Sequence, residues 1–217
     1  MRTKLRFVLF VFLLGALVFG SAGRIDLPWI WAWFAVNLSV MIFTARHIDQ
    51  SLMAERMRPG PGGTDRKLRL MAMPFLIAHL VVAGLDVGRF HWSDTVPLAL
   101  QIAGLIGLGL FMALSGWAVT VNRFFSPVVR IQTERGHHLI TDGPYRWIRH
   151  PGYIAAMICF PCGALALGSW WSLAPMAPIV GLMLRRTIIE DRFLREQLDG
   201  YAEYALRVRY RLVPGLW

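Results

Sequence analysis

The residues in this sequence whose types are best suited to chemistry lie in one polar and aromatic segment, GPYRWIRHPGY, residues 143–153. Long apolar stretches flank this segment on both sides. Arginine and histidine beside helices of bilayer length are expensive to expose to lipid, so we expect Arg149 and His150 to face a cavity lined by protein. The function of the chain is therefore expected in that cavity.

The composition indicates a membrane protein, because 56% of the residues are hydrophobic and only 17% are charged. A span needs about 20 residues at about 1.5 Å per residue, and the last apolar run is long enough for a helical hairpin turning near residues 169–171. We therefore predict an all-α fold, a polytopic membrane helical bundle of about six transmembrane helices with a C-terminal cytoplasmic or interfacial helix. The apolar runs cover roughly residues 7–22, 27–45, 70–88, 96–121 and 152–184.

The basic residues test this topology. With the N-terminus inside, 21 of the 23 lysines and arginines fall on the inner side, and only Arg24 and Arg89 fall outside. Both termini are therefore expected in the cytoplasm. The net charge of +10 follows from topology and from attraction to anionic lipid, so no nucleic-acid partner is expected.

The N-terminal region also has the pattern of a secretory signal, with basic residues 2–6, an apolar run and small residues 20–22. We expect an uncleaved first helix instead. Cys159 and Cys162 have the spacing of a redox dithiol, but they lie inside a predicted span, where a thiolate is disfavoured.

The chain divides into two regions by the distribution of its polar residues. Residues 1–121 are expected to form a scaffold of four spans with a basic loop at 46–69. Residues 122–217 carry nearly all the patterned polar residues, in a cytoplasmic segment at 122–150, the hairpin, and a charged helix from about 185 to 207.

The sequence context argues against a nucleotide-binding glycine loop and against a metal site. Gly104, Gly107 and Gly109 do not follow a strand, so we expect them to pack helices, as at Gly84 and Gly88. The histidines are scattered or adjacent, and no HExxH or cysteine-rich set is present, so no metal site is expected.

The second half resembles the isoprenylcysteine carboxyl methyltransferase (ICMT) family of integral membrane methyltransferases, which shares its C-terminal pattern with membrane phospholipid N-methyltransferases. The resemblance covers roughly residues 122–217 and depends on the combination of motifs. It implies that this region is catalytic and contains a cytoplasmic cofactor loop. The matching residues are Gln132, 137–145, 149–153, Arg186, Glu190, Asp191, Leu194, Tyr201, Tyr204 and 211–215.

The resemblance implies a multi-pass membrane enzyme that binds S-adenosylmethionine (S-adenosyl-L-methionine) on the cytoplasmic side. Arg186 would contact a lipophilic or lipidated acceptor, most consistently a carboxylate or a thiolate, and Arg186 and Glu190 would be the catalytic pair on one helix face. We expect the enzyme to be surrounded by membrane lipid and to need no obligate protein partner. The residues implied for the cofactor are Gln132, His137, His138, Leu139, Ile140, Tyr145, His150, Pro151, Gly152, Tyr153 and Glu190.

Other interpretations stay open at this point. The chain could be a phospholipid N-methyltransferase, a membrane NADPH-dependent sterol-type reductase or a membrane scaffold without activity. Arg149 and His150 could reach lipid phosphates, and Trp147 fits an interfacial aromatic belt. Tyr201 and Tyr204 are expected to pack against the bilayer surface.

Overall fold

A computed structural model describes residues 2–217, including the side chains of residues 12–68 and 70–217. The side chains of the basic residues 2–6 lie outside this part. Within residues 2–217 the protein is helical and forms no strand. The α-helices are α1 (Arg2–Ala22), α2 (Pro28–His47), α3 (Gln50–Met57), α4 (Leu68–Leu85), α5 (Leu98–Val121), α6 (Pro151–Ala166), α7 (Met176–Gln197) and α8 (Tyr201–Arg207).

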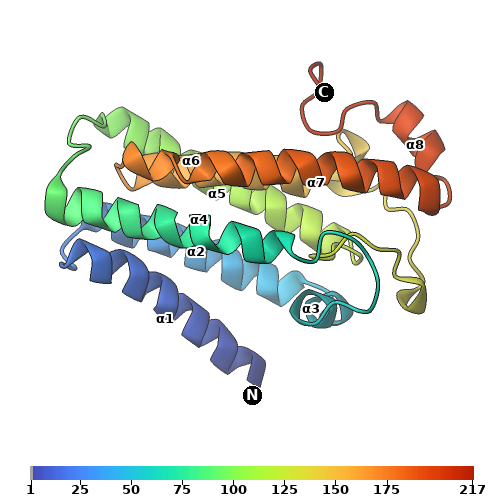
Figure 1. The fold of residues 1–217 in the computed structure, drawn as a ribbon, viewed down its shortest axis with the longest axis horizontal. Coiled ribbons are helices and arrows are strands. Elements are labelled where there is room, and N and C mark those ends of the chain that lie inside the picture. Colours follow the sequence, from blue (N-terminus) through green and yellow to red (C-terminus); the bar gives the residue numbers. More distant parts are fainter. Residues whose placement is uncertain (1) are drawn as a thin grey trace.

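The long helices lie side by side, and their connections gather at two opposite ends of the bundle (Figure 1). Helix α3, the segment between α5 and α6, and α8 lie at one end, on the right of Figure 1. The turns between α1 and α2, α4 and α5, and α6 and α7 lie at the other end. The basic segments that follow α2, α5 and α7 therefore share one end of the bundle.

Four helical stretches are long and apolar enough to cross a membrane, at Pro28–His47, Leu70–Phe90, Leu98–Val121 and Trp171–Gln197. Two shorter apolar helices, at Phe12–Ala22 and Pro151–Ala166, correspond to the other two expected spans. The all-α membrane architecture is therefore confirmed, whereas the count of six spans and the orientation of the termini stay predictions.

Glycines let the helices approach one another closely, as the sequence predicts. The space where a Cβ on Gly88 would lie is occupied by the backbone and side chain of Ala22, and Gly84 packs in the same way on Val18 and Ser21. A Cβ on Gly104 would lie 2.8 Å from the Cys162 carbonyl oxygen. These glycines therefore join α1 to α4 and to the helical turn Asp86–Phe90 that follows it, and join α5 to α6.

The C-terminal hairpin turns where the sequence predicts, between Ala166 and Met176, with a short 3₁₀ turn at Trp171–Leu173. The expectation of a separate charged helix from residue 185 to 207 is wrong. Helix α7 continues without a break from its apolar first half through its charged second half to Gln197. The break falls at Gly200, whose φ of +75° favours glycine, and α8 begins after it.

The basic loop expected at residues 46–69 also contains a helix, α3. The side chain of Asp49 accepts a hydrogen bond from the Leu52 backbone N–H and so caps its start.

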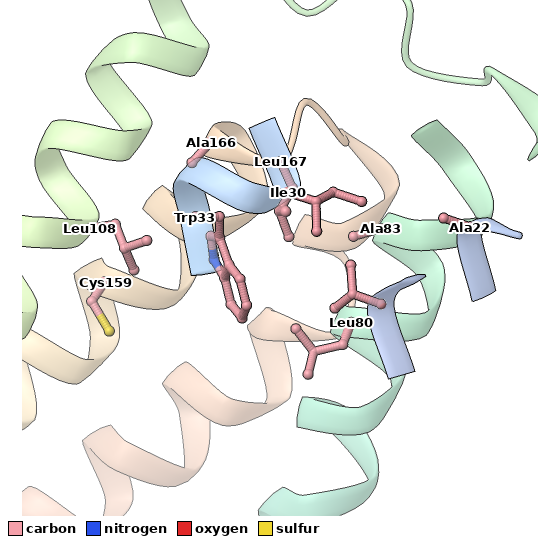
Figure 2. Close-up of a cluster of buried hydrophobic side chains, with 10 residues drawn as sticks. Ala22, Ile30, Trp33, Leu80, Ala83, Leu108, Cys159, Ala166 and Leu167 are labelled. Carbon is pink, nitrogen blue, oxygen red and sulfur yellow. The ribbon is translucent and has the colours of Figure 1, made fainter. Parts of the chain in front are cut away.

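An apolar core joins α1, α2, α4, α5 and α6 (Figure 2). The indole of Trp33 lies between Leu108 and Cys159 on one side and Leu80 on the other (Figure 2). The segment 122–150, the charged second half of α7, and α8 lie towards the end of the bundle that holds α3 (Figure 1).

Candidate active site

A pocket enclosing about 710 Å³, part of it open to solvent, lies between the end of α5, the segment 122–150, the start of α6, and helices α7 and α8. Nine of the eleven residues expected at a cofactor site line it. They are His137, His138, Leu139, Ile140, Tyr145, His150, Gly152, Tyr153 and Glu190. Gln132 and Pro151 are buried beside the pocket, and neither they nor Arg186 are among its lining residues.

Asp191 of α7 organises the wall of this pocket. Its buried carboxylate accepts hydrogen bonds from Arg149 Nε at 2.6 Å and from Arg211 Nε at 2.9 Å. The Tyr201 hydroxyl donates to it at 3.1 Å, and His150 Nε2 lies 3.3 Å away. One carboxylate thus ties α6, α7, α8 and the C-terminal segment together.

The C-terminal segment holds the start of α6 through backbone contacts as well. The backbone N–H of Arg149 donates to the Tyr210 carbonyl oxygen at 3.0 Å, and that of His150 donates to the Arg211 carbonyl oxygen at 2.9 Å. The Arg149 guanidinium also donates to the Val208 carbonyl oxygen at 2.6 Å. Arg149 and His150 are both buried, so they do not reach out to lipid phosphates.

A hydrogen-bonded chain connects Glu190, Tyr153 and Arg186 across α6 and α7. The Tyr153 hydroxyl donates to Glu190 Oε2 and accepts a hydrogen bond from Arg186 Nε at 2.7 Å. Glu190 and Tyr153 line the pocket, and Arg186 lies behind them. The two α7 side chains share a helix face, as their spacing predicts.

The remaining nitrogens of Arg186 are also occupied. They donate to the carbonyl oxygens of Pro127, at 2.8 Å, and Ser126, at 3.3 Å. In this arrangement the guanidinium holds Tyr153 against the segment that follows α5, and its side chain is almost fully buried.

The segment 132–140 forms the outer wall and is fixed by Gln132. The side-chain amide of this buried residue donates to the Phe124 carbonyl oxygen at 2.7 Å, and its backbone N–H donates to His137 Nδ1 at 3.2 Å. In the described part of the chain, no acceptor is paired with the backbone N–H groups of Leu139 and Ile140. Unpaired N–H groups beside a pocket can bind an anionic group.

His137 stacks on Phe124, with ring centroids 4.4 Å apart. Burial lowers the pKa of His137 to about 4, and the neighbouring charges of His138, Arg135 and Arg130 act in the same direction. The ring is therefore neutral near pH 7, and its Nδ1 is available to accept from Gln132.

An ion pair between Arg130 and Glu55 connects the segment 122–150 to α3. Arg130 donates to both carboxylate oxygens of Glu55, at 3.0 and 2.7 Å, and both side chains are buried. Burial raises the pKa of the Glu55 carboxyl, but hydrogen bonds from Arg130, Ser126 and the Gly60 backbone outweigh it and hold the pKa at about 2. This end of the bundle is thus fixed by fully ionised pairs.

The absence of a side chain at Gly152 lets the Phe125 ring reach the pocket wall. A Cβ at this position would lie 2.6 Å from two carbons of the Phe125 ring, so only glycine leaves room for that ring. Phe125, His150 and Tyr153 then line the pocket with aromatic rings.

The expectation that Tyr201 and Tyr204 pack against the bilayer surface is wrong. Both are buried and line the pocket. The Tyr204 hydroxyl donates to the Tyr145 carbonyl oxygen at 2.7 Å, and burial raises the pKa of Tyr204 well above 10, so the phenol stays a donor. Tyr201 and Tyr204 are three residues apart on a short helix, and this spacing predicts that both side chains lie on the same face of the helix.

Other pocket residues carry no signal strong enough to be found in the sequence. They are Asn122, Phe124, Phe125 and Leu198, whereas Leu194 is one of the residues that carry the family resemblance. Trp147, by contrast, lies exposed with its ring edge against Trp117, as an interfacial side chain does.

A second, largely apolar cavity lies among α1, α2, α3, α4, α5 and α6, and it encloses about 1830 Å³, part of it open to the surroundings of the protein. Arg56 lines it and lies over the Phe125 ring, 5.5 Å from the centroid, while Phe125 lines the first pocket. The two cavities therefore approach each other at the contact between Phe125 and Arg56.

Comparisons with known proteins agree with this geometry. A family model described as phospholipid methyltransferase matches residues 99–199. The chain is 31% identical over 147 residues to a probable protein-S-isoprenylcysteine O-methyltransferase of Oryza sativa subsp. indica, covering 65% of this chain and 74% of the relative. It is 26% identical to the protein-S-isoprenylcysteine O-methyltransferase of Rattus norvegicus, covering 64% of this chain and 52% of the relative.

Another similar protein is not named as a methyltransferase. The cobalt-zinc-cadmium resistance protein CzcN of Cupriavidus metallidurans is 30% identical over 139 residues, covering 61% of this chain and 58% of the relative.

Proposed function

Because this chain belongs to the protein-S-isoprenylcysteine O-methyltransferase family of membrane methyltransferases, we propose that it transfers a methyl group from S-adenosylmethionine to a lipophilic carboxylate or thiolate. The observation that carries this proposal is the pocket, in which nine residues of the implied cofactor set converge from separate segments. A scaffold without activity would not need such convergence.

The pocket residues fit the chemical groups of the cofactor. The unpaired N–H groups of Leu139 and Ile140 suit its carboxylate, and Glu190 suits its ammonium or hydroxyl groups. The rings of Phe125 and Tyr153 suit a sulfonium, which aromatic faces attract. When bound, S-adenosylmethionine supplies an activated methyl group whose transfer removes the positive charge of the sulfonium.

The chain's own task is then alignment and exclusion of water, because a carboxylate or thiolate already carries the attacking charge. The apolar cavity suits a lipophilic acceptor, and its approach to Phe125 would bring the reacting end to the cofactor pocket. We place Arg186 as a positioning residue that acts through Tyr153.

We place the site on the cytoplasmic side of the membrane. The pocket lies at the end of the bundle where the basic segments gather, and such segments favour the cytoplasmic face (Figure 1).

A phospholipid N-methyltransferase is the second candidate, favoured by the description of the matching family model. An amine acceptor must lose a proton, which Glu190 or a neutral His137 could accept at the pocket wall. The products distinguish the two candidates, since one gains methyl groups on oxygen or sulfur and the other on nitrogen.

The test uses the full chain purified in lipid nanodiscs. Calorimetry with S-adenosylmethionine and with NADPH should show binding of the first only. Mass spectrometry after incubation with lipophilic thiols, carboxylates and amines should identify the methylated class. Preferential binding of NADPH would support a reductase instead, and binding of neither compound would remove the proposal.

Two variants connect this binding to the pocket. His150→Ala and Tyr145→Ala should each weaken S-adenosylmethionine binding roughly tenfold or more, about 1.4 kcal/mol. His91→Ala is the matched control, because His91 lies exposed after α4, outside the pocket. Unchanged affinity in both pocket variants would place the cofactor elsewhere.

A further inference from the structure

Two of the polar side chains that line the largely apolar cavity are buried, and the methyl-transfer site uses neither. Trp33 of α2 is 5% exposed and His79 of α4 is 3% exposed, and both line the cavity. Among the described residues the indole Nε1 of Trp33 has no hydrogen-bond partner. A buried donor without a partner is costly, so its presence in a cavity wall indicates a ligand that supplies the acceptor.

The hydrogen bonds of His79 determine which of its nitrogens faces a ligand. His79 Nδ1 lies 2.5 Å from the Ser172 hydroxyl oxygen and 3.2 Å from the Ser172 carbonyl oxygen, which can only accept. The single proton of the Ser172 hydroxyl donates to the His79 carbonyl oxygen at 3.1 Å, so the hydroxyl oxygen also accepts from Nδ1. We therefore assign the ring proton to Nδ1. Nε2 of the neutral ring is then an acceptor, and no partner pairs with it in the described part of the chain.

The serine that orients His79 is itself fixed. The backbone N–H of Ser172 donates to the Ser169 hydroxyl at 3.1 Å, and that hydroxyl donates to buried Asp86 at 2.5 Å. The imidazole is thus held by a network that reaches the turn between α6 and α7, which leaves its Nε2 in a defined place.

Gly163 of α6 brings the two nitrogens to one small space. A Cβ on this glycine would lie 3.2 Å from Trp33 Nε1 and 3.8 Å from His79 Nε2. The indole nitrogen, blue in Figure 2, lies on the side of the ring towards Cys159 of α6. A donor and an acceptor therefore border the same point of a largely apolar cavity.

We propose that this pair binds a hydroxyl group on a lipophilic ligand inside the cavity. A hydroxyl can accept from Trp33 Nε1–H and donate to His79 Nε2 at the same time. An ether can satisfy only the indole, and a hydrocarbon satisfies neither nitrogen. The cavity thus selects a lipid alcohol over an alkyl or prenyl chain without oxygen.

The position of the subsite along α6 places the hydroxyl within the acceptor. Gly163 follows Tyr153 by ten residues, about 15 Å of helix. If the acceptor of the proposed methyl transfer occupies this cavity, its hydroxyl lies far from the methylated atom. That assignment rests on the proposed function, whereas binding of a lipid alcohol does not.

The experiment measures binding without S-adenosylmethionine. The full chain in detergent is titrated with hexadecan-1-ol or with its methyl ether, and native mass spectrometry gives the dissociation constants. The unmodified chain should bind the alcohol roughly three- to tenfold more tightly than the ether, the range expected for one net hydrogen bond.

Two substitutions test the pair. Trp33→Phe deletes the donor that alcohol and ether share and keeps an aromatic ring, so both ligands should bind more weakly while the preference for the alcohol remains. Gly163→Ala fills the space between the nitrogens with a methyl group and should remove the preference. The matched controls are Trp92→Phe, at an exposed ring outside the cavity, and Gly181→Ala, where a Cβ meets nothing within 4 Å. Both controls should retain the preference and the ether affinity.

Equal affinity for alcohol and ether in the unmodified chain would overturn the proposal, and the pair would then hold a water molecule only. A preference that survives in Gly163→Ala, or an ether affinity that Trp33→Phe leaves unchanged, would overturn it as well. Should Trp33→Phe fail to fold, Gly163→Ala decides alone. A chain that methylates an acceptor but shows no preference refutes this inference only, and a chain that shows the preference without methylating refutes the proposed function only.

Discussion

Arg149 and Asp191, 42 residues apart in the sequence, form a double hydrogen bond with nitrogen–oxygen distances of 2.6 and 3.2 Å. Both side chains are almost completely buried. Removing one partner of a buried ion pair leaves the other charge without compensation, which costs more than the pair itself contributes.

Asp191→Asn should therefore lower the free energy of unfolding by about 3–5 kcal/mol and weaken S-adenosylmethionine binding with it. The amide keeps the shape but cannot balance the charges of Arg149 and Arg211. Chemical denaturation in detergent measures the first effect. Glu196→Gln is the control, because its ion pair with Arg192 is exposed and contributes little. Equal stability of the two variants would show that Asp191 is not the organising charge.

Arg186→Lys should reduce turnover roughly 10- to 100-fold, about 1.4 to 2.7 kcal/mol in transition-state stabilisation. A lysine keeps the charge but cannot hold the Tyr153 hydroxyl and the carbonyl oxygens of Ser126 and Pro127 together. If Arg186 acts through Tyr153, the double variant with Tyr153→Phe should be no slower than the slower single variant. Additive losses in turnover would instead indicate that Arg186 contacts the acceptor directly.

Glu190→Gln should act mainly on the cofactor, because it removes the carboxylate that faces the pocket. The dissociation constant for S-adenosylmethionine should rise, while Arg186→Lys should leave it nearly unchanged. Calorimetry on both variants checks this division. Equal losses of affinity would place Arg186 in the cofactor site.

The free energy of unfolding should fall as the pH decreases from 6.5 to 4. The unfolded chain protonates His137 below its ordinary pKa of 6.5, whereas burial holds the pKa of the folded ring at about 4. Protonation of Nδ1 would also break the hydrogen bond from the Gln132 backbone. Glu55, with a pKa of about 2 against an ordinary 4.5, loses its contribution mainly at lower pH.

Unfolding midpoints between pH 7 and 4 test this prediction. His137→Gln should flatten the dependence, and His138→Gln, at an exposed neighbouring ring, should not. An equally steep profile in His137→Gln would assign the effect to other groups.

Labelling of single cysteines should find residues 46–69 and 122–150 on the same, cytoplasmic face of the membrane. These segments share one end of the bundle (Figure 1) and carry many of the basic residues. Introduced cysteines at exposed Arg58 and Arg146 are suitable positions, and Trp92 at the opposite end is the control. Accessibility of the two segments from opposite faces would refute the predicted topology.

The helices and the pocket were predictable to different degrees. Apolar runs of bilayer length and the close-packing glycines follow directly from local sequence, and both were found. The continuity of α7 was not predicted, because a change from apolar to charged composition looks like a boundary although no residue breaks the helix before Gly200.

Within the site, motif residues such as His150 and Glu190 were predicted by resemblance. The central role of Asp191 was not, because it depends on partners from α6, α8 and the C-terminal segment, which no local pattern relates. Phe125 was missed for a similar reason. Its access to the pocket depends on the missing side chain of Gly152, which is distant in sequence.

The side-chain partners of Arg149 all lie 42 to 60 residues further along the chain. During synthesis, this guanidinium therefore leaves the ribosome well before the carboxylate and carbonyl groups that will receive it. The Arg149 side chain, next to the start of α6, does not have all of these acceptors until α7, α8 and the residues after α8 have been synthesised. The binding pocket is thus completed late in biogenesis, and a ribosome stalled before Asp191 would hold a chain that contains most of the apolar bundle but no site.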